Sequence, residues 1–182
     1  MKLAVFCLIF ALTLSAQATT EDVVSRLDST LQAINAERDH GPISMAVAVP
    51  TNYKVQAAML ITFRKIAAML EPLVSSGPGE IEVLSYGDRV RVSVAQPFTS
   101  DSSKASQAMA YLKISTGPQS SPSNVFDAIA QATSDLEARP ANQRRIIVVI
   151  GESGKDPEND RKLKDSINRA ARSNVLIFFV AP

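Results

Sequence analysis

"RIIVVI", residues 145–150, and "VLIFFV", residues 175–180, decide the fold class. Apart from Arg145 both runs are apolar and rich in β-branched residues, and neither alternates polar with apolar residues as a strand with one solvent-exposed face does. Such strands are typical of parallel sheets that are covered on both faces. Strand and helix patterns alternate along the rest of the chain. The sequence therefore predicts a doubly wound α/β domain with a mostly parallel sheet, helices on both faces and one antiparallel edge hairpin.

The other elements follow from their periodicity. "ISMAVAV" (43–49) predicts a strand, and residues 80–98 predict a hairpin that turns at Gly87 and Asp88, with Val90, Val92 and Val94 on its buried face. Residues 20–39 place Val23, Leu27, Leu31 and Ile34 at helical spacing, so this amphipathic helix either packs on the domain, which is favoured, or meets a partner. Further helices are expected at 55–74, 101–114, 124–138 and 158–172.

The first residues have the layout of a secretory signal peptide. Lys2 precedes an apolar run from Leu3 to Leu14, and Ala16-Gln17-Ala18 resembles a cleavage site. A retained membrane anchor is the alternative, although the run is short for a bilayer. We therefore expect a signal peptide at 1–18, a helical leader at 19–41, a domain at 42–182, and a secreted or periplasmic protein.

Cleavage after Ala18 would change the net charge and the cysteine content of the chain, and both limit its possible partners and chemistry. Of 19 basic and 18 acidic residues the signal segment holds only Lys2, so 18 of each remain. A neutral chain disfavours nucleic acid or an anionic membrane as partner. The single cysteine, Cys7, leaves with the same segment, which excludes disulfides and thiolate metal sites.

"GESGKD", residues 151–156, can be interpreted in three ways. A phosphate-binding loop requires glycine where Val149 stands and a hydroxyl where Asp156 stands. A serine nucleophile elbow around Ser153 requires glycine in place of Lys155, and its triad would need His40, the only histidine. The third interpretation is a metal-ligand loop.

Three segments resemble the von Willebrand factor A family, particularly its exported bacterial members. They are "FTSD" after a strand, "SNVFDAIAQA", and "RRIIVVIGES", which is similar to the family's Arg-Arg-apolar-Thr-Asp-Gly segment. The resemblance covers residues 43–182 and implies a Rossmann-like fold. It also implies a further helix after residue 180, so that either the chain is shortened or residues 20–39 cover that face.

The family holds Mg²⁺ or Mn²⁺ with oxygens from three loops, leaving one position for an acidic group of the partner. By position, the resemblance puts Pro50, Asn52 and Lys54 where aspartate, serine and serine are expected. Ser123 replaces a threonine and Glu152 an aspartate. An ammonium group at Lys54 would repel the metal, so the site is expected to be degenerate and to need no cofactor. Each candidate also has a structural role open to it, such as Ser123 as a helix N-cap and Asp127 as a first-turn acid.

The predicted function is that of an exported, non-enzymatic module that binds a protein. Its predicted contact residues lie in the loops at the carboxyl ends of the strands: Thr51, Asn52, Tyr53, Lys54, Ser121, Ser123, Glu152 and Ser153. The alternative is a Mg²⁺- or Mn²⁺-dependent adhesion domain with a residual site at Asn52, Ser123 and Glu152. A hydrolase that uses Ser153 is the third hypothesis.

Overall fold

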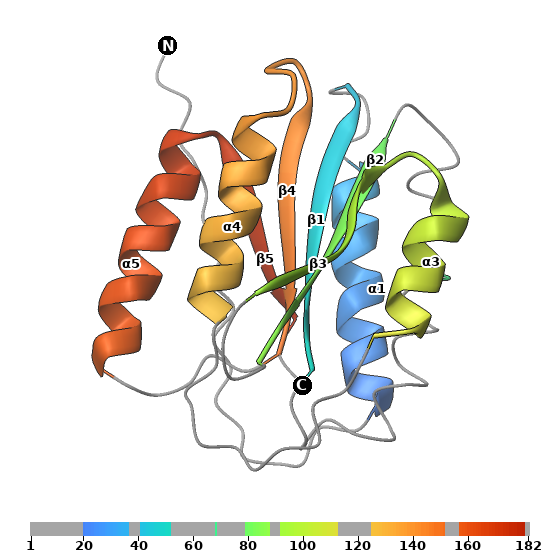
Figure 1. Cartoon of the computed structure of the whole chain (residues 1–182), viewed down its shortest axis with the longest axis horizontal. Helices are drawn as coiled ribbons and strands as arrows, with labels where there is room; N and C mark the ends of the chain where they lie inside the picture. Colours follow the sequence, from blue (N-terminus) through green and yellow to red (C-terminus); the bar gives the residue numbers. More distant parts are fainter. Residues whose placement is uncertain are drawn as a thin grey trace.

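The computed structural model describes residues 20–36, 41–51, 68, 79–87, 92–112, 125–151 and 157–180. Within them, five strands form one sheet in the order β3-β2-β1-β4-β5 (Figure 1). The strands are β1 (Ile43–Pro50), β2 (Glu80–Tyr86), β3 (Ser93–Thr99), β4 (Arg144–Ile150) and β5 (Val175–Val180). The helices are α1 (Thr20–Ala36), α3 (Ser102–Ala110), α4 (Val125–Glu137) and α5 (Pro157–Arg172).

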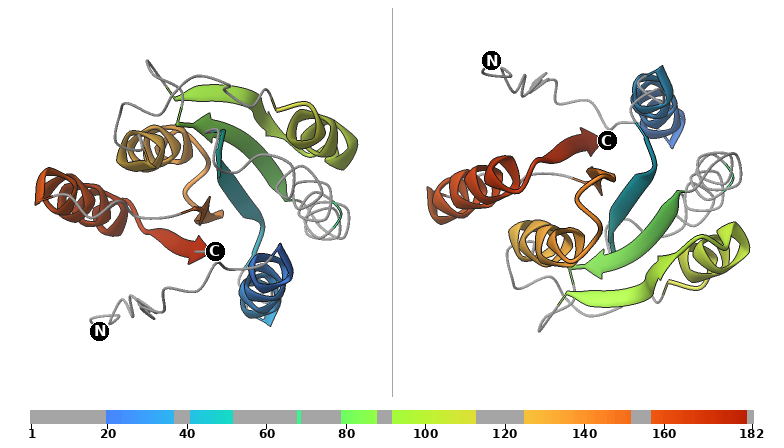
Figure 2. Two further views of the ribbon diagram at one scale, coloured as in Figure 1. Left: turned by 90° about the horizontal axis from the view of Figure 1, so that it is seen from below. Right: turned by 90° about the horizontal axis from the view of Figure 1, so that it is seen from above.

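The pairing of the strands confirms the predicted fold class. β1 runs parallel to β2 and to β4, and β4 runs parallel to β5, whereas β2 and β3 pair antiparallel at one edge. Helices lie on both faces of the sheet, with α4 and α5 on one and α1 and α3 on the other (Figure 2). The carboxyl ends of β1, β2, β4 and β5 therefore meet at a single edge of the sheet.

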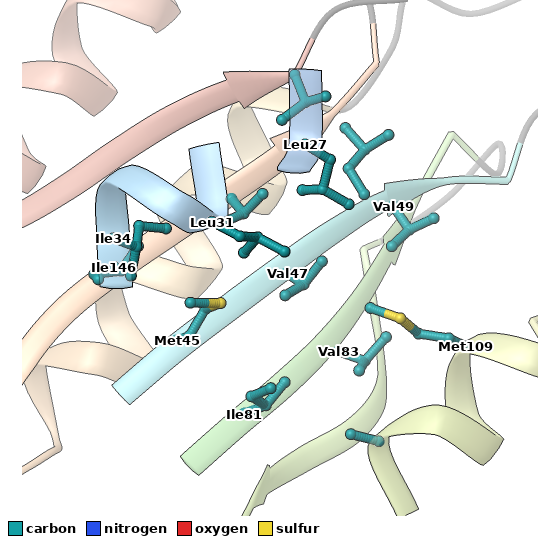
Figure 3. Close-up of a cluster of buried hydrophobic side chains, with 14 of the residues drawn as sticks. Leu27, Leu31, Ile34, Met45, Val47, Val49, Ile81, Val83, Met109 and Ile146 are labelled. Carbon is teal, nitrogen blue, oxygen red and sulfur yellow. The ribbon is translucent and has the colours of Figure 1, made fainter. Parts of the chain in front are cut away.

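α1 packs on the sheet, as the amphipathic pattern favoured. Leu27, Leu31 and Ile34 are 0%, 4% and 1% exposed, and they lie over the β1 side chains Met45, Val47 and Val49 (Figure 3). The same cluster includes Val180 and packs against Phe178, so α1 also reaches β5. This helix supplies one layer of the core and does not stand apart as an interaction segment.

α4 and α5 cover the opposite face through small and branched side chains. The buried cluster on this face joins the sheet to both helices through Ala46, Ala48, Leu84, Tyr86, Ile147, Val149, Ala128, Ile129, Ala132, Leu136 and Ala170. Alanines on β1 let α4 approach closely, since they leave little side chain between helix and strand. This close packing fixes the position of the α4 N-terminus above the carboxyl ends of β1 and β2.

Two predictions about the sheet edges were wrong in detail. Val94 was expected on a buried face and is 40% exposed, because β3 is outermost and the β2–β3 register shifts twice, so alternation does not carry through. "VLIFFV" was expected to be covered on both faces, yet β5 pairs with β4 alone among the described strands and Phe179 is 41% exposed. A fully apolar run is thus compatible with an edge position when helices cover its two faces only in part.

Arginines next to an apolar strand ordinarily flank it in solvent, but Arg144 and Arg145 do not. Both belong to β4 and are partly buried. Arg145 donates to the carbonyl oxygens of Arg139 (2.6 Å) and Ser173 (3.3 Å), and Arg144 donates to that of Ile34 (3.4 Å). The arginines tie three chain reversals to the amino end of the sheet, because a guanidinium can satisfy several carbonyls at once.

The predicted helix at 55–74 lies outside the described residues, apart from Ala68. Among the helices that are described, none combines the length and apolarity required to cross a membrane.

Candidate functional site

The candidate site is the edge of the sheet where β1, β2 and β4 end. The chain leaves β1 toward β2 on one side and leaves β4 toward β5 on the other, so the strand order reverses between β1 and β4. Ligands of doubly wound folds bind at such a reversal. Of the eight predicted contact residues, only Thr51 lies within the described residues; Asn52, Tyr53, Lys54, Ser121, Ser123, Glu152 and Ser153 lie outside them.

Thr51 anchors the start of the first loop. It is 4% exposed, its amide donates to the carbonyl oxygen of Tyr86 at 2.8 Å, and its hydroxyl donates to the same oxygen at 3.0 Å. Both polar groups are thus used inside the protein. The Thr51 side chain holds the end of β1 to the end of β2 and does not face outward to a partner.

Tyr86 connects β2 to β4 across the end of β1. The side chain is 2% exposed, and its hydroxyl donates to the carbonyl oxygen of Ile150. Burial raises the pKa of the Tyr86 phenol, because the phenolate would lose its hydration. The hydroxyl therefore stays protonated at neutral pH and acts as a structural donor, not as a base.

Gly151 begins the third loop and must lack a side chain. Its φ is +133°, and a Cβ built there would lie under 3.0 Å from the Tyr86 hydroxyl and 3.5 Å from Cγ of Pro50. The Gly151 amide donates to the carbonyl oxygen of Val180 at 3.0 Å. This glycine accommodates the Tyr86 hydroxyl, so the conformation of the third loop at its start depends on a residue 65 positions away.

Pro50 occupies the place where the resemblance implies the first metal carboxylate. It is buried at the end of β1 and has neither an N–H nor a side-chain oxygen. With Tyr86 and Gly151 it forms what we call the seal, which is uncharged. Within the part of the chain that the structure describes, no group of three or more His, Cys, Asp or Glu side chains could hold a metal ion.

The second loop ends at the N-terminus of α4, beside the seal. Val125 and Phe126 are buried in the same cluster as Tyr86, whereas Asp127 is exposed in the first turn. An acid in this position is favoured by the helix dipole. Each of the three predicted loops thus adjoins a residue that hydrogen bonds or burial hold in place: Thr51, Val125 and Gly151.

Sequence reasoning missed Tyr86 and Gly151 as determinants of this site. Tyr86 was counted only as part of a strand, and Gly151 only as a loop glycine. For Gly151 the sequence offered one signal, because a glycine directly after a buried strand can adopt a positive φ. The partner that requires it lies far away in the sequence and could not be identified from local pattern.

Comparison with known proteins supports the fold. No protein-family model and no curated protein matches the chain. It is similar to the crystal structure of the conserved hypothetical protein BatB from Bacteroides thetaiotaomicron, with a TM-score of 0.58 and 16% identity over 75% of this chain and 65% of that one. It is also similar to an aerotolerance-related membrane protein from Bacteroides fragilis, with a TM-score of 0.55 and 17% identity over 75% of this chain and 66% of that one.

The chain spans just under two thirds of the length of both structures. At this level of identity the likeness concerns the path of the backbone and not its side chains. The chain therefore has the mostly parallel α/β fold of these bacterial proteins.

Proposed function

We propose that the chain is an exported, non-enzymatic module of the von Willebrand factor A type that binds a protein through the loops at the carboxyl ends of its strands, without a metal. Three things support the proposal: the resemblance of the three segments, the doubly wound sheet, and the backbone likeness to two bacterial proteins. The loop residues proposed for contact are the seven beyond the described residues, Asn52, Tyr53, Lys54, Ser121, Ser123, Glu152 and Ser153.

The observation that carries the metal-free part of the proposal is the seal. A cation site needs several oxygen ligands converging on one point. At the end of β1 the buried Pro50 offers none from its side chain, and the Thr51 and Tyr86 hydroxyls are already donated to carbonyl oxygens. A cation placed here would find these two hydroxyl oxygens but, among the described residues, no cluster of carboxylates to neutralise its charge.

The structure also favours a binding role for the loops over a catalytic one. The loops start from strands whose ends are held by several hydrogen bonds, and binding residues are commonly placed on loops that a rigid scaffold supports. The described part of the site offers no base for the Ser153 hydroxyl, since the Tyr86 phenol is buried and stays protonated. Ser153→Ala is expected to leave any esterase background unchanged.

A thermal melt of the purified chain in excess EDTA, and then in millimolar Mg²⁺ or Mn²⁺, tests the proposal against the adhesion-domain alternative. A ligand of the native state at ~100 times its dissociation constant adds about 2.7 kcal/mol of stability. For a domain of this size that is a rise of about 5 to 11 °C in Tm. We expect no rise. A clear rise with either cation would favour the metal-dependent adhesion domain.

The double variant Pro50→Asp, Lys54→Ser serves as a positive control for this assay. It restores a carboxylate and a hydroxyl where the family has them, and the new carboxylate would be buried without a counter-charge. We expect it to melt lower in EDTA and to regain stability with Mg²⁺ or Mn²⁺. If the parent chain gains as much from the cation as the double variant, the degenerate-site interpretation fails.

Partner binding is tested with a variant that changes the loops and a control variant that changes exposed residues elsewhere. The loop variant carries Asn52→Ala, Lys54→Ala and Glu152→Ala. The control carries Asn142→Ala, Lys164→Ala and Asp165→Ala, three exposed positions away from the loops. A protein that is captured by the parent and the control, and lost with the loop variant, supports the proposal. Equal capture by both variants would place the contact elsewhere.

A further inference from the structure

Glu82 is a buried carboxyl group that the proposed function does not use. It lies in the middle of β2, opposite Ala46 of β1 in the parallel register, and it is 3% exposed. Alternation along β2 puts Glu82 on the same face as Leu84 and Tyr86, which α4 covers. The surroundings of this carboxyl are therefore the strand neighbours and the C-terminal half of α4.

Among the described residues, no cation forms an ion pair or hydrogen bond with Glu82. Its Oε2 atom is buried and has no hydrogen-bond partner among the described residues. The nearby guanidinium of Arg139 is already engaged, since its Nε and Nη2 atoms donate to the two carboxylate oxygens of Glu80 at 2.7 Å and 2.6 Å. Arg139 also lies over the ring of Phe98, 5.0 Å from its centroid. A charged Glu82 would thus be desolvated with only the partial compensation that the nearby Arg139 charge gives.

The other charges around Glu82 add to this cost. α4 contributes Asp135 and β2 contributes Glu80, both of which repel a second negative charge, and only Arg139 attracts it. The described residues of β1 and β3, "ISMAVAVP" and "SVAQPFT", contain no charged side chain. Burial first, and then Asp135, raise the pKa of Glu82 from 4.5 to about 8, against the opposing effect of Arg139.

We propose that Glu82 is a proton-binding switch in the packing of α4 on β2: the folded chain holds its carboxyl protonated at neutral pH, and the fold loses stability as rising pH makes that proton harder to retain. The neutral acid lies among Ala46, Leu84 and the α4 side chains, whereas a carboxylate would leave its Oε2 atom without a partner among the described residues. This inference does not depend on the proposed binding function, because it concerns the opposite end of α4 from the loops.

The direction of the effect follows from linkage. The folded chain binds the proton more tightly than the unfolded chain does, so the proton contributes stability that is fully present below pH 4.5. This contribution is lost progressively as pH rises and is gone above about pH 8. Over this window the folded-to-unfolded ratio falls by up to ~10-fold per pH unit for one proton.

A carboxyl-carbon NMR titration of the full chain, with the Glu82 resonance assigned through its own side-chain carbons, tests the proposal on the unaltered protein. We expect Glu82 to titrate with a midpoint above pH 6.5, apart from the exposed glutamates. A midpoint below pH 6.5 would overturn the proposal.

Chemical denaturation at pH 5.5, 6.5 and 7.5 tests the consequence for stability. Between the ends of this range the unfolding constant of the parent should rise by up to ~100-fold relative to that of Glu82→Gln, which cannot release the proton. Asp135→Asn should reduce this rise, because it removes a repulsive charge. The matched control is Glu137→Gln: the hydrogen bond from Arg169 lowers the pKa of exposed Glu137, so its loss should leave the parent's pH dependence between 5.5 and 7.5 unchanged. Equal pH dependence in the parent and Glu82→Gln would refute the switch.

Discussion

Replacing Gly151 by alanine tests the seal directly. The added methyl group meets two obstacles that can be separated. One is the backbone, whose φ of +133° is a conformation that residues with a Cβ rarely adopt. The other is the Tyr86 hydroxyl, which would lie under 3.0 Å from the new Cβ.

The magnitudes add to a large effect for one methyl group. Backbone strain of this kind costs about 1–3 kcal/mol. Forcing an extra carbon into a packed site costs about 1–3 kcal/mol more. Gly151→Ala should therefore lower the free energy of unfolding by about 2–6 kcal/mol, a large part of the stability of an ordinary domain.

Tyr86→Phe separates the two obstacles. By itself it should cost about 1–3 kcal/mol, because the buried Ile150 carbonyl loses the phenolic donor. In the Tyr86→Phe background the new methyl group no longer meets the hydroxyl, so Gly151→Ala should cost only the backbone strain. The double variant should then be more stable than the sum of the single changes by about 1–3 kcal/mol.

The assay is urea denaturation of the parent, both single variants and the double variant, with the slope of unfolding free energy against urea checked for constancy. Residues that do not touch give additive effects within about 0.5 kcal/mol. Additivity would mean that Gly151 and Tyr86 do not meet. If Gly151→Ala has no effect on stability, the third loop does not begin as described. The metal-free part of the proposed function would then lose the support of the seal.

Two further predictions concern the helices beside the site. Leu27 in α1 is 0% exposed, so Leu27→Ala should lower the free energy of unfolding in urea by about 2–5 kcal/mol. Deletion of residues 19–40 should uncover the β1 face and cause aggregation. A deleted chain that stays monomeric and melts like the parent would contradict this. Asp101 caps α3 by accepting from the Ser103 and Lys104 amides, so Asp101→Ala should lower the urea midpoint whereas Asp101→Asn should leave it nearly unchanged. Equal losses in the two variants would show that the cap is not the cause.

The fold could be predicted because its determinants are local. Apolar β-branched runs such as "RIIVVI" predict buried strands without reference to a partner, and Gly87 marks the hairpin between β2 and β3. Element types were correct wherever the structure describes them. The wrong details concern the edges, since neither the exposure of Val94 nor that of Phe179 follows from a run of residues without the strand order.

The anchors of the site could not be predicted, because each is a long-range contact. Tyr86 and Ile150 are 64 positions apart, and Thr51 and Tyr86 are 35 apart. Nothing in the local sequence distinguishes Glu80, which is paired, from Glu82, which is not. α4 covers this face of β2 and buries the second glutamate, and the neighbouring Ile81 and Val83 do not indicate that contact.

The position of the polar groups at the seal limits how this site can recognise a partner. The Thr51 amide and hydroxyl, the Tyr86 hydroxyl and the Gly151 amide each already donate to a backbone carbonyl, so none of them can donate to a ligand without loss of stability. Recognition must then come from loop side chains beyond these anchors. Stability and binding should accordingly respond to different residues: changes at Tyr86 or Gly151 should unfold the chain before they alter specificity, and changes at Asn52, Lys54 or Glu152 should alter binding with little effect on the melt. A metal site that included the anchor residues would couple stability to partner binding, since removing the ion would weaken stability and binding at once.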